Sequence, residues 1–381
     1  MRLRLLPIAI FALVLLLGAK LVDVWTGVAD LSIAVVNAQD EKIAAFQDLA
    51  DQIGDTSEAV ASLKAAADLS GTSLDTVAAA IPQLKSGKVN DWESLGLLSS
   101  PTIEGDRVYV VTSRCEVLCL SVDGMAKGNQ GPYKDEAKYA VLDIVGPDGK
   151  PAAPIPPGPK DADILWRYDM MDDLGVFPHN ASNCSVLIVG DVLYVCTSNG
   201  QDWTHVNIPS PLSPSLIAIN KKTGELLGED DAKIGSRLFH GQWSSPSTGK
   251  VNGKDLIFFG GGDGFCYAFD AIPKKEGDGN FLKTVWKYDA NPPEYKTKDG
   301  KAIKYPAAEG PSEINSTPVF WKNRIYVATG QDPEHGEGVG HLVCLDATKT
   351  GDITKTGVIW EFKGINRSIS TVSIDPTTGL L

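Results

Sequence analysis

The sequence has 381 residues, with 48 acidic and 35 basic side chains and a formal net charge of −13. With 43% apolar and 22% charged residues it has the composition of a folded globular protein, which excludes a chain disordered throughout. The acidic balance argues against nucleic acid as a partner, because phosphate binding needs a dense basic surface. The 38 glycines and 23 prolines favour short strands and turns over a helical bundle.

A basic start and an apolar run open the chain. Arg2 and Arg4 precede an uncharged stretch from Leu5 to Ala19, which is the pattern of an export signal. With Leu21 to Trp25 included, the stretch reaches the length of a membrane span. Residues 1–27 are therefore predicted to be a signal or anchor segment, as either an uncleaved membrane anchor or a removed signal peptide. We expect the rest of the chain on the exported side, in the periplasm or cell envelope, because basic residues stay inside.

Residues 28–89 are predicted to form a short helical spacer. Apolar residues from Ile43 to Ile53, and again from Leu74 to Leu84, recur at three- and four-residue steps. Helices of this kind between an anchor and a domain serve as a spacer or a small docking surface, and nothing in them supports a catalytic role.

A repeat occupies residues 90–381. Each copy has a Ser-Ser-Pro-like box, a short apolar strand, a polar turn and a second, strongly apolar strand. The boxes begin at Ser99, Cys184, Ser244, Ser316 and Ser370. A third strand follows, and then a fourth with a tryptophan beside an aromatic residue, at Trp166, Trp286 and Trp360; the second copy has Gly228 there. Sheets packed radially against sheets hide their edges, so the repeat predicts an all-β propeller of four-stranded blades.

Two stretches carry a family resemblance. Ala218-x-Asn220-x-x-Thr223-Gly224, and Asp346-x-x-x-Thr350-Gly351 followed by Trp360, resemble the tryptophan-docking repeat of pyrroloquinoline-quinone (PQQ) propellers. The resemblance implies a PQQ-like β-propeller of exported bacterial proteins, related to quinoprotein dehydrogenases and the outer-membrane assembly propeller. Such rings close with about seven or eight blades. Four units and the start of a fifth therefore indicate a truncated ring, while a small complete ring or closure through a partner chain stays open.

Six cysteines in an exported protein allow disulfides. The repeat favours buried free thiols instead, because Cys119 and Cys344 align with Ala218 and Ala268, at positions for small apolar residues.

The histidines suggest a site. Gly200-Gln201-Asp202-x-x-His205 recurs as Gly330-Gln331-Asp332-x-x-His335 after the second strand of two units, and His179 and His240 precede first strands. In a propeller these loops open on one face. A ligand site there would use His179, Asp202, His205, His240, Asp332, His335 and Arg367, and a metal site would use His205, His335, His341 and Asp332. In the competing interpretation, Gln and Asp hydrogen-bond the loop backbone while His packs, and Arg237 and Arg367 form salt bridges.

Two functions follow. The first is a binding or scaffold module in the cell envelope, tethered to the membrane by the N-terminal segment and bound to an envelope protein partner. The alternative, implied by the resemblance, is a PQQ- and Ca²⁺-dependent quinoprotein dehydrogenase that oxidises an alcohol or sugar. It needs carboxylate and amide ligands for Ca²⁺, a carboxylate base and an arginine beside the quinone, and Asp202, Asp332 and Arg367 are available. The family's catalytic motif is not matched residue by residue, so whether the chain is an enzyme stays open. A metal-dependent hydrolase on the histidine face is a third hypothesis.

Overall fold

The computed structural model of the protein describes residues 96–134, 136, 150, 156–305, 307, 310–330, 340–366 and 368–381. The predicted signal or anchor segment (1–27) and helical spacer (28–89) lie outside these residues, and so does the predicted start of the repeat region at residue 90. Within the described ranges, no helix is both long and apolar enough to cross a bilayer.

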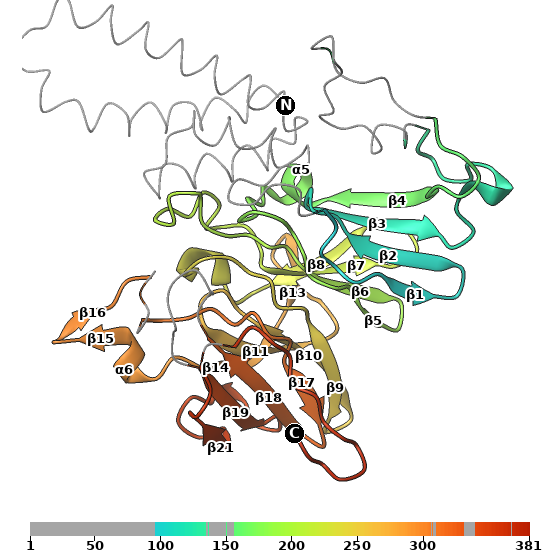
Figure 1. The fold of residues 1–381 in the computed structure, drawn as a ribbon. Helices are drawn as coiled ribbons and strands as arrows, with labels where there is room; N and C mark the ends of the chain where they lie inside the picture. The colour runs from blue at the N-terminus through green and yellow to red at the C-terminus, as the bar shows by residue number, and fades with distance from the viewer. Residues whose placement is uncertain are drawn as a thin grey trace, which may run out of the picture.

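Most of the regular structure in the described chain is β-strand, arranged in successive antiparallel sheets (Figure 1). The sixteen strands that correspond to the four predicted units are β1 (Thr102–Glu104), β2 (Arg107–Val111), β3 (Glu116–Ser121), β4 (Ile164–Asp169); β5 (Leu187–Val189), β6 (Val192–Cys196), β7 (Leu216–Asn220), β8 (Leu226–Asp230); β9 (Ser247–Val251), β10 (Lys254–Gly260), β11 (Phe265–Asp270), β14 (Thr284–Asp289); and β17 (Val319–Trp321), β18 (Arg324–Thr329), β19 (His341–Asp346), β21 (Val358–Phe362). Each group of four is a meander in which neighbours in sequence are neighbours in the sheet. The predicted all-β class is therefore confirmed.

Small elements decorate these sheets. They are the 3₁₀ helices η2 (Gly124–Lys127) and η4 (Ile234–Arg237), the helices α5 (Met170–Leu174) and α6 (Pro293–Lys296), and the strands β12 (Lys274–Glu276), β13 (Gly279–Leu282), β15 (Thr297–Lys298), β16 (Lys301–Ala302) and β20 (Gly351–Asp352). β13 joins the second sheet by pairing parallel to β8, and β20 joins the third by pairing parallel to β14. Both additions cross from one unit to the preceding one, so they tie consecutive sheets together.

The strand register repeats from sheet to sheet. In the first sheet, Cys119 on β3 lies between Tyr109 on β2 and Trp166 on β4. The equivalent triplets are Tyr194–Ala218–Gly228, Phe258–Ala268–Trp286 and Tyr326–Cys344–Trp360. A small residue thus stands on the third strand beside large rings, and the register to the fourth strand shifts directly after it in every sheet. The alignment of Cys119 and Cys344 with two alanines is confirmed.

The tryptophan of the fourth strand docks on the next unit. Trp166 Nε1 donates to the Lys221 carbonyl at 3.1 Å, and Trp286 Nε1 donates to the equivalent Ala347 carbonyl at 3.2 Å. Gly224 has φ +78°, and a Cβ built on it would lie 2.8 Å from the Trp166 ring, so the position requires glycine. Gly351, which follows Thr350, is the pairing partner of Trp286.

The second unit replaces the tryptophan by a different donor. Where the indole would stand, Gly228 approaches Pro273 so closely that a Cβ would lie 2.7 Å from the proline Cβ. The Tyr194 hydroxyl, from the second strand, donates to the Ala271 carbonyl, which is the position equivalent to Lys221 and Ala347. The contact between units is therefore kept although its side chain changes.

A second link between units involves the boxes. Ser100 N donates to Ser185 Oγ at 3.2 Å, and Ser185 N donates to Ser245 Oγ at 2.9 Å. In the last pair, Thr317 N donates to Thr371 Oγ1 at 3.0 Å. The middle hydroxyl of each of these boxes therefore satisfies a backbone N–H of the preceding unit, and the predicted fifth box takes part.

The outer face of the fourth unit is exposed. Trp166 and Trp286 are 6% and 0% exposed, but Trp360 is 37% exposed. Val358, Ile359 and Phe362 on the same strand are exposed as well. No further sheet among the described residues covers β21, which accounts for the difference.

All six cysteines are buried and free, as the favoured prediction had it. Desolvation is the main cause that raises the pKa of Cys196 to about 12, and it also raises the pKa of Cys115 and Cys266. The thiolate form is therefore disfavoured at these positions.

The two tryptophan environments lead to a first prediction. Trp286→Ala should lower the free energy of unfolding by about 3–5 kcal/mol, because it empties a fully buried site, whereas Trp360→Ala should cost about half as much or less. Urea denaturation of the full chain measures both. Equal losses would contradict the packing described for β14 and β21.

The cysteines lead to a second prediction. A thiol reagent such as Ellman's reagent should label none of the six cysteines of the native protein within minutes, because their thiols are buried and protonated. All six should react after unfolding in denaturant without reductant. A count of four or fewer in the unfolded chain would reveal a disulfide.

Candidate functional site

Three loops meet at one end of the second and third sheets. They are the loop before β5, the loop between β6 and β7, and the loop before β9. Gly200 N donates to the Phe177 carbonyl at 2.9 Å, and Gln201 N donates to the His240 carbonyl at 2.8 Å. An isolated bridge also pairs Pro178 with Asn199. The backbone itself therefore brings together loops that the sequence analysis expected on one face.

Gly200 allows this close approach. A Cβ at this position would lie 2.5 Å from the Cβ of His179 and 3.0 Å from the His240 carbonyl oxygen. Any side chain would force the loops apart, so the first residue of the predicted Gly-Gln-Asp hexad is required for packing.

The loops place three histidines in contact, and we call His179, His205 and His240 the histidine triad. Their ring centroids lie 4.2 Å (His179–His240), 4.9 Å (His179–His205) and 4.9 Å (His205–His240) apart. One ring nitrogen from each lies within 4.8 Å of the others. His179 and His240 are 0% and 3% exposed, and His205 is half-buried. The triad is the only group of three or more potential metal-binding side chains found among the described residues.

Hydrogen bonds define the tautomers of the two buried histidines. His179 Nδ1 lies 2.8 Å from the Gln201 carbonyl oxygen, and since a carbonyl only accepts, Nδ1 carries the proton. Nε2 of a neutral His179 is then an acceptor, and it lies 2.7 Å from His240 Nε2, which must donate. His240 Nδ1 accepts in turn from the Tyr305 hydroxyl at 2.7 Å. This assignment follows from the network and leaves both imidazoles neutral.

Glu313 extends the cluster. It is fully buried, and its Oε1 lies 3.7 Å from His240 Nδ1. Its Oε2 has no hydrogen-bond partner among the described residues. Asn315 Nδ2 donates to Glu313 Oε1 at 3.3 Å, while Asn315 Oδ1 lacks a partner in the same part of the chain. Gln201 Oε1 and Asn183 Oδ1 share this property. Buried polar atoms are normally paired, so this concentration of free acceptors needs an explanation.

Asp202 holds the loop that carries His205. One carboxylate oxygen accepts from the backbone N–H and hydroxyl of Thr204 at 3.1 and 2.6 Å, and the other accepts from Asn207 Nδ2 at 3.1 Å. His205 N donates to the Asp202 carbonyl at 3.0 Å, and His205 adopts φ +57°, a left-handed conformation uncommon for residues other than glycine. Asp202 thus hydrogen-bonds the loop, as the competing interpretation of the hexad expected, and the loop turns His205 toward the other two histidines.

The remaining predicted residues lie elsewhere. His341 is buried on β19, where its Nε2 lies 3.1 Å from Glu361 Oε2 and its Nδ1 lies 3.3 Å from the Ala290 carbonyl oxygen. Asp332, His335 and Arg367 lie outside the described residues. The structure therefore brings together His179, His205 and His240 of the predicted ligand set, and Asp202 supports them from the loop.

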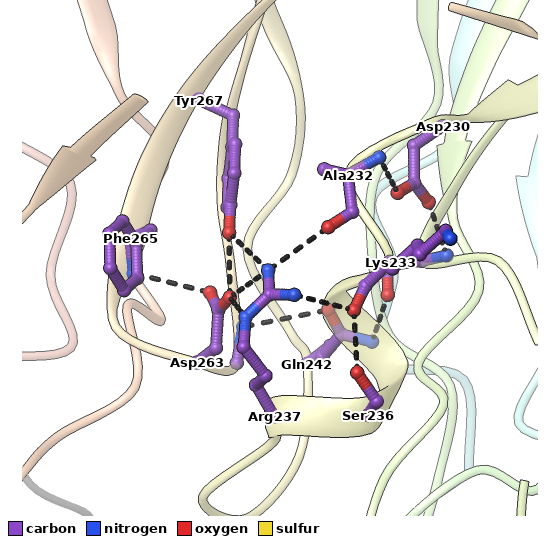
Figure 2. A network of polar contacts seen from close by, with 11 residues as sticks. Asp230, Ala232, Lys233, Ser236, Arg237, Gln242, Asp263, Phe265 and Tyr267 are labelled. Atoms are coloured by element: carbon purple, nitrogen blue, oxygen red, sulfur yellow. Dashed lines mark hydrogen bonds and ion pairs between the residues drawn. The ribbon is translucent and has the colours of Figure 1, made fainter. Parts of the chain in front are cut away.

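Arg237 forms a salt bridge, as the sequence analysis favoured (Figure 2). Its Nη2 lies 2.8 Å from Asp263 Oδ2 and 2.9 Å from the Tyr267 hydroxyl, and Nη1 donates to the Lys233 carbonyl at 2.9 Å. Tyr267 also donates to Asp263 at 2.6 Å. Desolvation raises the pKa of Asp263 from 3.8 to about 6, although the tyrosine and arginine oppose it, and burial also raises the pKa of Tyr267.

Sequence reasoning missed Tyr305 and Glu313. Glu313 stands five residues before Pro318 of its box, as Arg367 stands five before Val372, so its loop position was a usable signal. Tyr305 comes from the insertion between the third and fourth units, which has no counterpart in the repeat. Only the folded chain shows that it reaches His240.

None of the protein-family models and none of the curated proteins matches this sequence. Similar solved structures include a quinohemoprotein alcohol dehydrogenase from Pseudomonas putida HK5, with 17% identity, a TM-score of 0.39, and 70% of this chain and 34% of that chain covered. BamB from Moraxella catarrhalis has 11% identity and a TM-score of 0.31, over 72% of this chain and 64% of that one. A europium-containing methanol dehydrogenase has 12% identity and a TM-score of 0.38, over 72% and 44%.

The chain thus spans less than two thirds of the length of each of these structures. At such identities and TM-scores the similarity supports no conclusion about activity. The all-β architecture rests on the sheets themselves.

Asp263 leads to a third prediction. The folded chain binds this proton more tightly than the unfolded chain does, so the carboxyl's contribution to stability is present below about pH 4 and is lost as the pH rises toward 6. Compared with Asp263→Asn, the wild type should lose about 2–3 kcal/mol of unfolding free energy between pH 4 and pH 7. Chemical denaturation across this pH range measures the difference. Asp278→Asn, in the exposed β12–β13 turn, is the control, and parallel curves for wild type and Asp263→Asn would contradict the prediction.

Proposed function

We propose that this chain is a PQQ-like β-propeller module, exported to the cell envelope, that binds a partner through the loops at the histidine-bearing end of its sheets. The repeated register, the tryptophan docking and the box hydrogen bonds support this type of ring. The N-terminal segment supports export and tethering to the membrane.

One observation carries the binding function. The buried polar atoms without partners among the described residues, at Asn183, Gln201, Glu313 and Asn315, all lie in loops before a first strand or after a second strand. Loops of this kind meet at one end of the sheets, so the free acceptors are concentrated there. A bound ligand or partner that donates hydrogen bonds would satisfy them.

The same loops also offer exposed apolar contacts. Val206 and Leu212, in the loop between β6 and β7, are 75% and 65% exposed. Both stand in the loop that carries Gln201 and His205. Exposed apolar residues beside polar acceptors are the mixture typical of a protein-binding surface.

A photo-crosslinking amino acid tests the proposal. Placed at Val206 or Leu212 of the full chain, it should form the same crosslinked product in intact cell envelopes, and excess unlabelled chain should suppress that product. Ile272 is the matched control, because it is 77% exposed but follows the third strand β11, at the opposite end of its sheet. Equal crosslinking at Ile272, or none at the loop positions, would overturn the assignment of this face.

The alternative, a PQQ- and Ca²⁺-dependent dehydrogenase, is supported by Glu313 and Asn315. Their free carboxylate and amide oxygens are donors that fit Ca²⁺. Bound PQQ would supply the electron acceptor for alcohol oxidation. Asp202 does not fit the role of the base, because both of its oxygens accept hydrogen bonds within the loop.

Reconstitution separates the two functions. The full chain, incubated with PQQ and Ca²⁺, should reduce no dye above background with methanol, ethanol or glucose. Turnover that disappears in Glu313→Gln would replace the binding module by the dehydrogenase.

A further inference from the structure

We propose that the histidine triad binds one divalent transition-metal ion of the Zn²⁺ class, through one ring nitrogen each of His179, His205 and His240. The binding module argued above does not need a metal, so this inference stands independently of it. It rests on the convergence of three imidazoles from three separate loops, with ligand atoms within 4.8 Å of one another.

The geometry is close to that of a metal site. Tetrahedral Zn²⁺ with Zn–N bonds of 2.0–2.1 Å places two ligand nitrogens about 3.3 Å apart. The Nε2 atoms of His179 and His240 are 2.7 Å apart and joined by a hydrogen bond. Separating them by about half an ångström would admit the ion, which small ring rotations provide. Their mutual hydrogen bond already points both nitrogens at a common centre.

The groups behind the rings are those that support metal ligands. A histidine that binds a metal normally donates its other ring N–H to a carbonyl or carboxylate. His179 Nδ1 already donates to the Gln201 carbonyl at 2.8 Å. His240 Nδ1 faces the Tyr305 oxygen at 2.7 Å and Glu313 Oε1 at 3.7 Å. Both buried rings therefore have an outer partner that would orient them for binding through Nε2.

Binding requires one proton to move. Without metal, the proton of His240 lies on Nε2, where it donates to His179. The ion takes the lone pair of Nε2 in the other tautomer, so this proton leaves Nε2 while Nδ1 gains one that faces the oxygens of Tyr305 and Glu313. The ring stays neutral throughout, and the two positive charges of the ion are the only charge added.

Glu313 provides the compensating charge. A divalent ion held by three neutral imidazoles would place two positive charges in a largely buried site, which costs free energy unless an anion is near. Glu313 is 0% exposed, lies beside His240, and keeps one carboxylate oxygen without a hydrogen-bond partner among the described residues. A buried carboxylate in this position is explained by a cation next to it.

The third ligand is held by its loop. His205 adopts its left-handed backbone because Asp202 and Thr204 close the turn before it, and Gly200 lets that turn pack on His179. The histidine is therefore presented by a fixed loop. Imidazole nitrogens prefer Zn²⁺ and its transition-metal neighbours, whereas Ca²⁺ takes oxygen ligands, so the ion class follows from the donors.

Metal titration of the full chain tests the site. Chelator-treated protein should bind one equivalent of Zn²⁺ in competition with a chromophoric chelator, and excess Ca²⁺ should not displace it. His205→Asn should weaken Zn²⁺ binding by about 100-fold, because it removes one of three ligands. Asparagine tolerates the left-handed backbone, so this variant is expected to fold. Tyr305→Phe should weaken binding by about tenfold by removing an outer partner.

His341→Gln is the matched control, since it removes a buried histidine outside the triad and should bind Zn²⁺ like the wild type. Circular dichroism checks that each variant is folded. Co²⁺ provides a second readout, and its visible spectrum should be that of a tetrahedral nitrogen-ligated ion in the wild type and in His341→Gln. Failure of the wild type to bind one equivalent, wild-type affinity in folded His205→Asn, or an octahedral Co²⁺ spectrum would overturn the proposal. The crosslinking at Val206 and Leu212 does not depend on any of these results.

Discussion

The structure depends on hydrogen bonds that pass from each four-stranded sheet to the next. One set runs from an aromatic donor, Trp166, Tyr194 or Trp286, to a backbone carbonyl just after the third strand of the following unit. Another runs from a box N–H to the hydroxyl of the next box. These groups are buried between sheets, where an unpaired donor or acceptor would cost about 1–3 kcal/mol. Each unit therefore needs its neighbour to complete its polar bonding as well as its core.

This constraint explains the second unit. Gly228 removes the tryptophan, yet the carbonyl of Ala271 still receives a donor, because the Tyr194 hydroxyl reaches it from the second strand. Pro273 fills the space that the indole would occupy. The repeat conserves a bond between units rather than a residue type, and Trp360, with no described sheet beyond it, shows the exposure that results when the neighbour is missing.

The same constraint positions the candidate site. Because consecutive units are locked in register, the loops before their first strands lie side by side, and His179 meets His240 although 61 residues separate them. The Gly200–His205 turn closes over them through backbone bonds to Phe177 and His240. Next to these nitrogen donors lie the oxygen donors of Glu313 and Asn315, from the fourth unit. Four loops from three sheets thus present donors that suit cations, in a chain whose net charge is −13.

Short-range patterns in the sequence were sufficient for the unit boundaries, the four strands of each unit, the small residue on the third strand and the loops that would hold polar side chains. Those features arise from alternation and turn chemistry over a few residues, which the sequence displays directly. Contacts between units were decided only by the tertiary structure: the Tyr194 substitute, the reach of Tyr305 and Glu313 to His240, and the salt bridge of Arg237 with Asp263. Asp202 and His205 stand in one predicted hexad, yet one hydrogen-bonds its own loop and the other turns inward, because a left-handed backbone at His205 separates their directions. Such outcomes depend on distances between residues tens of positions apart, and these distances are set when the sheets pack.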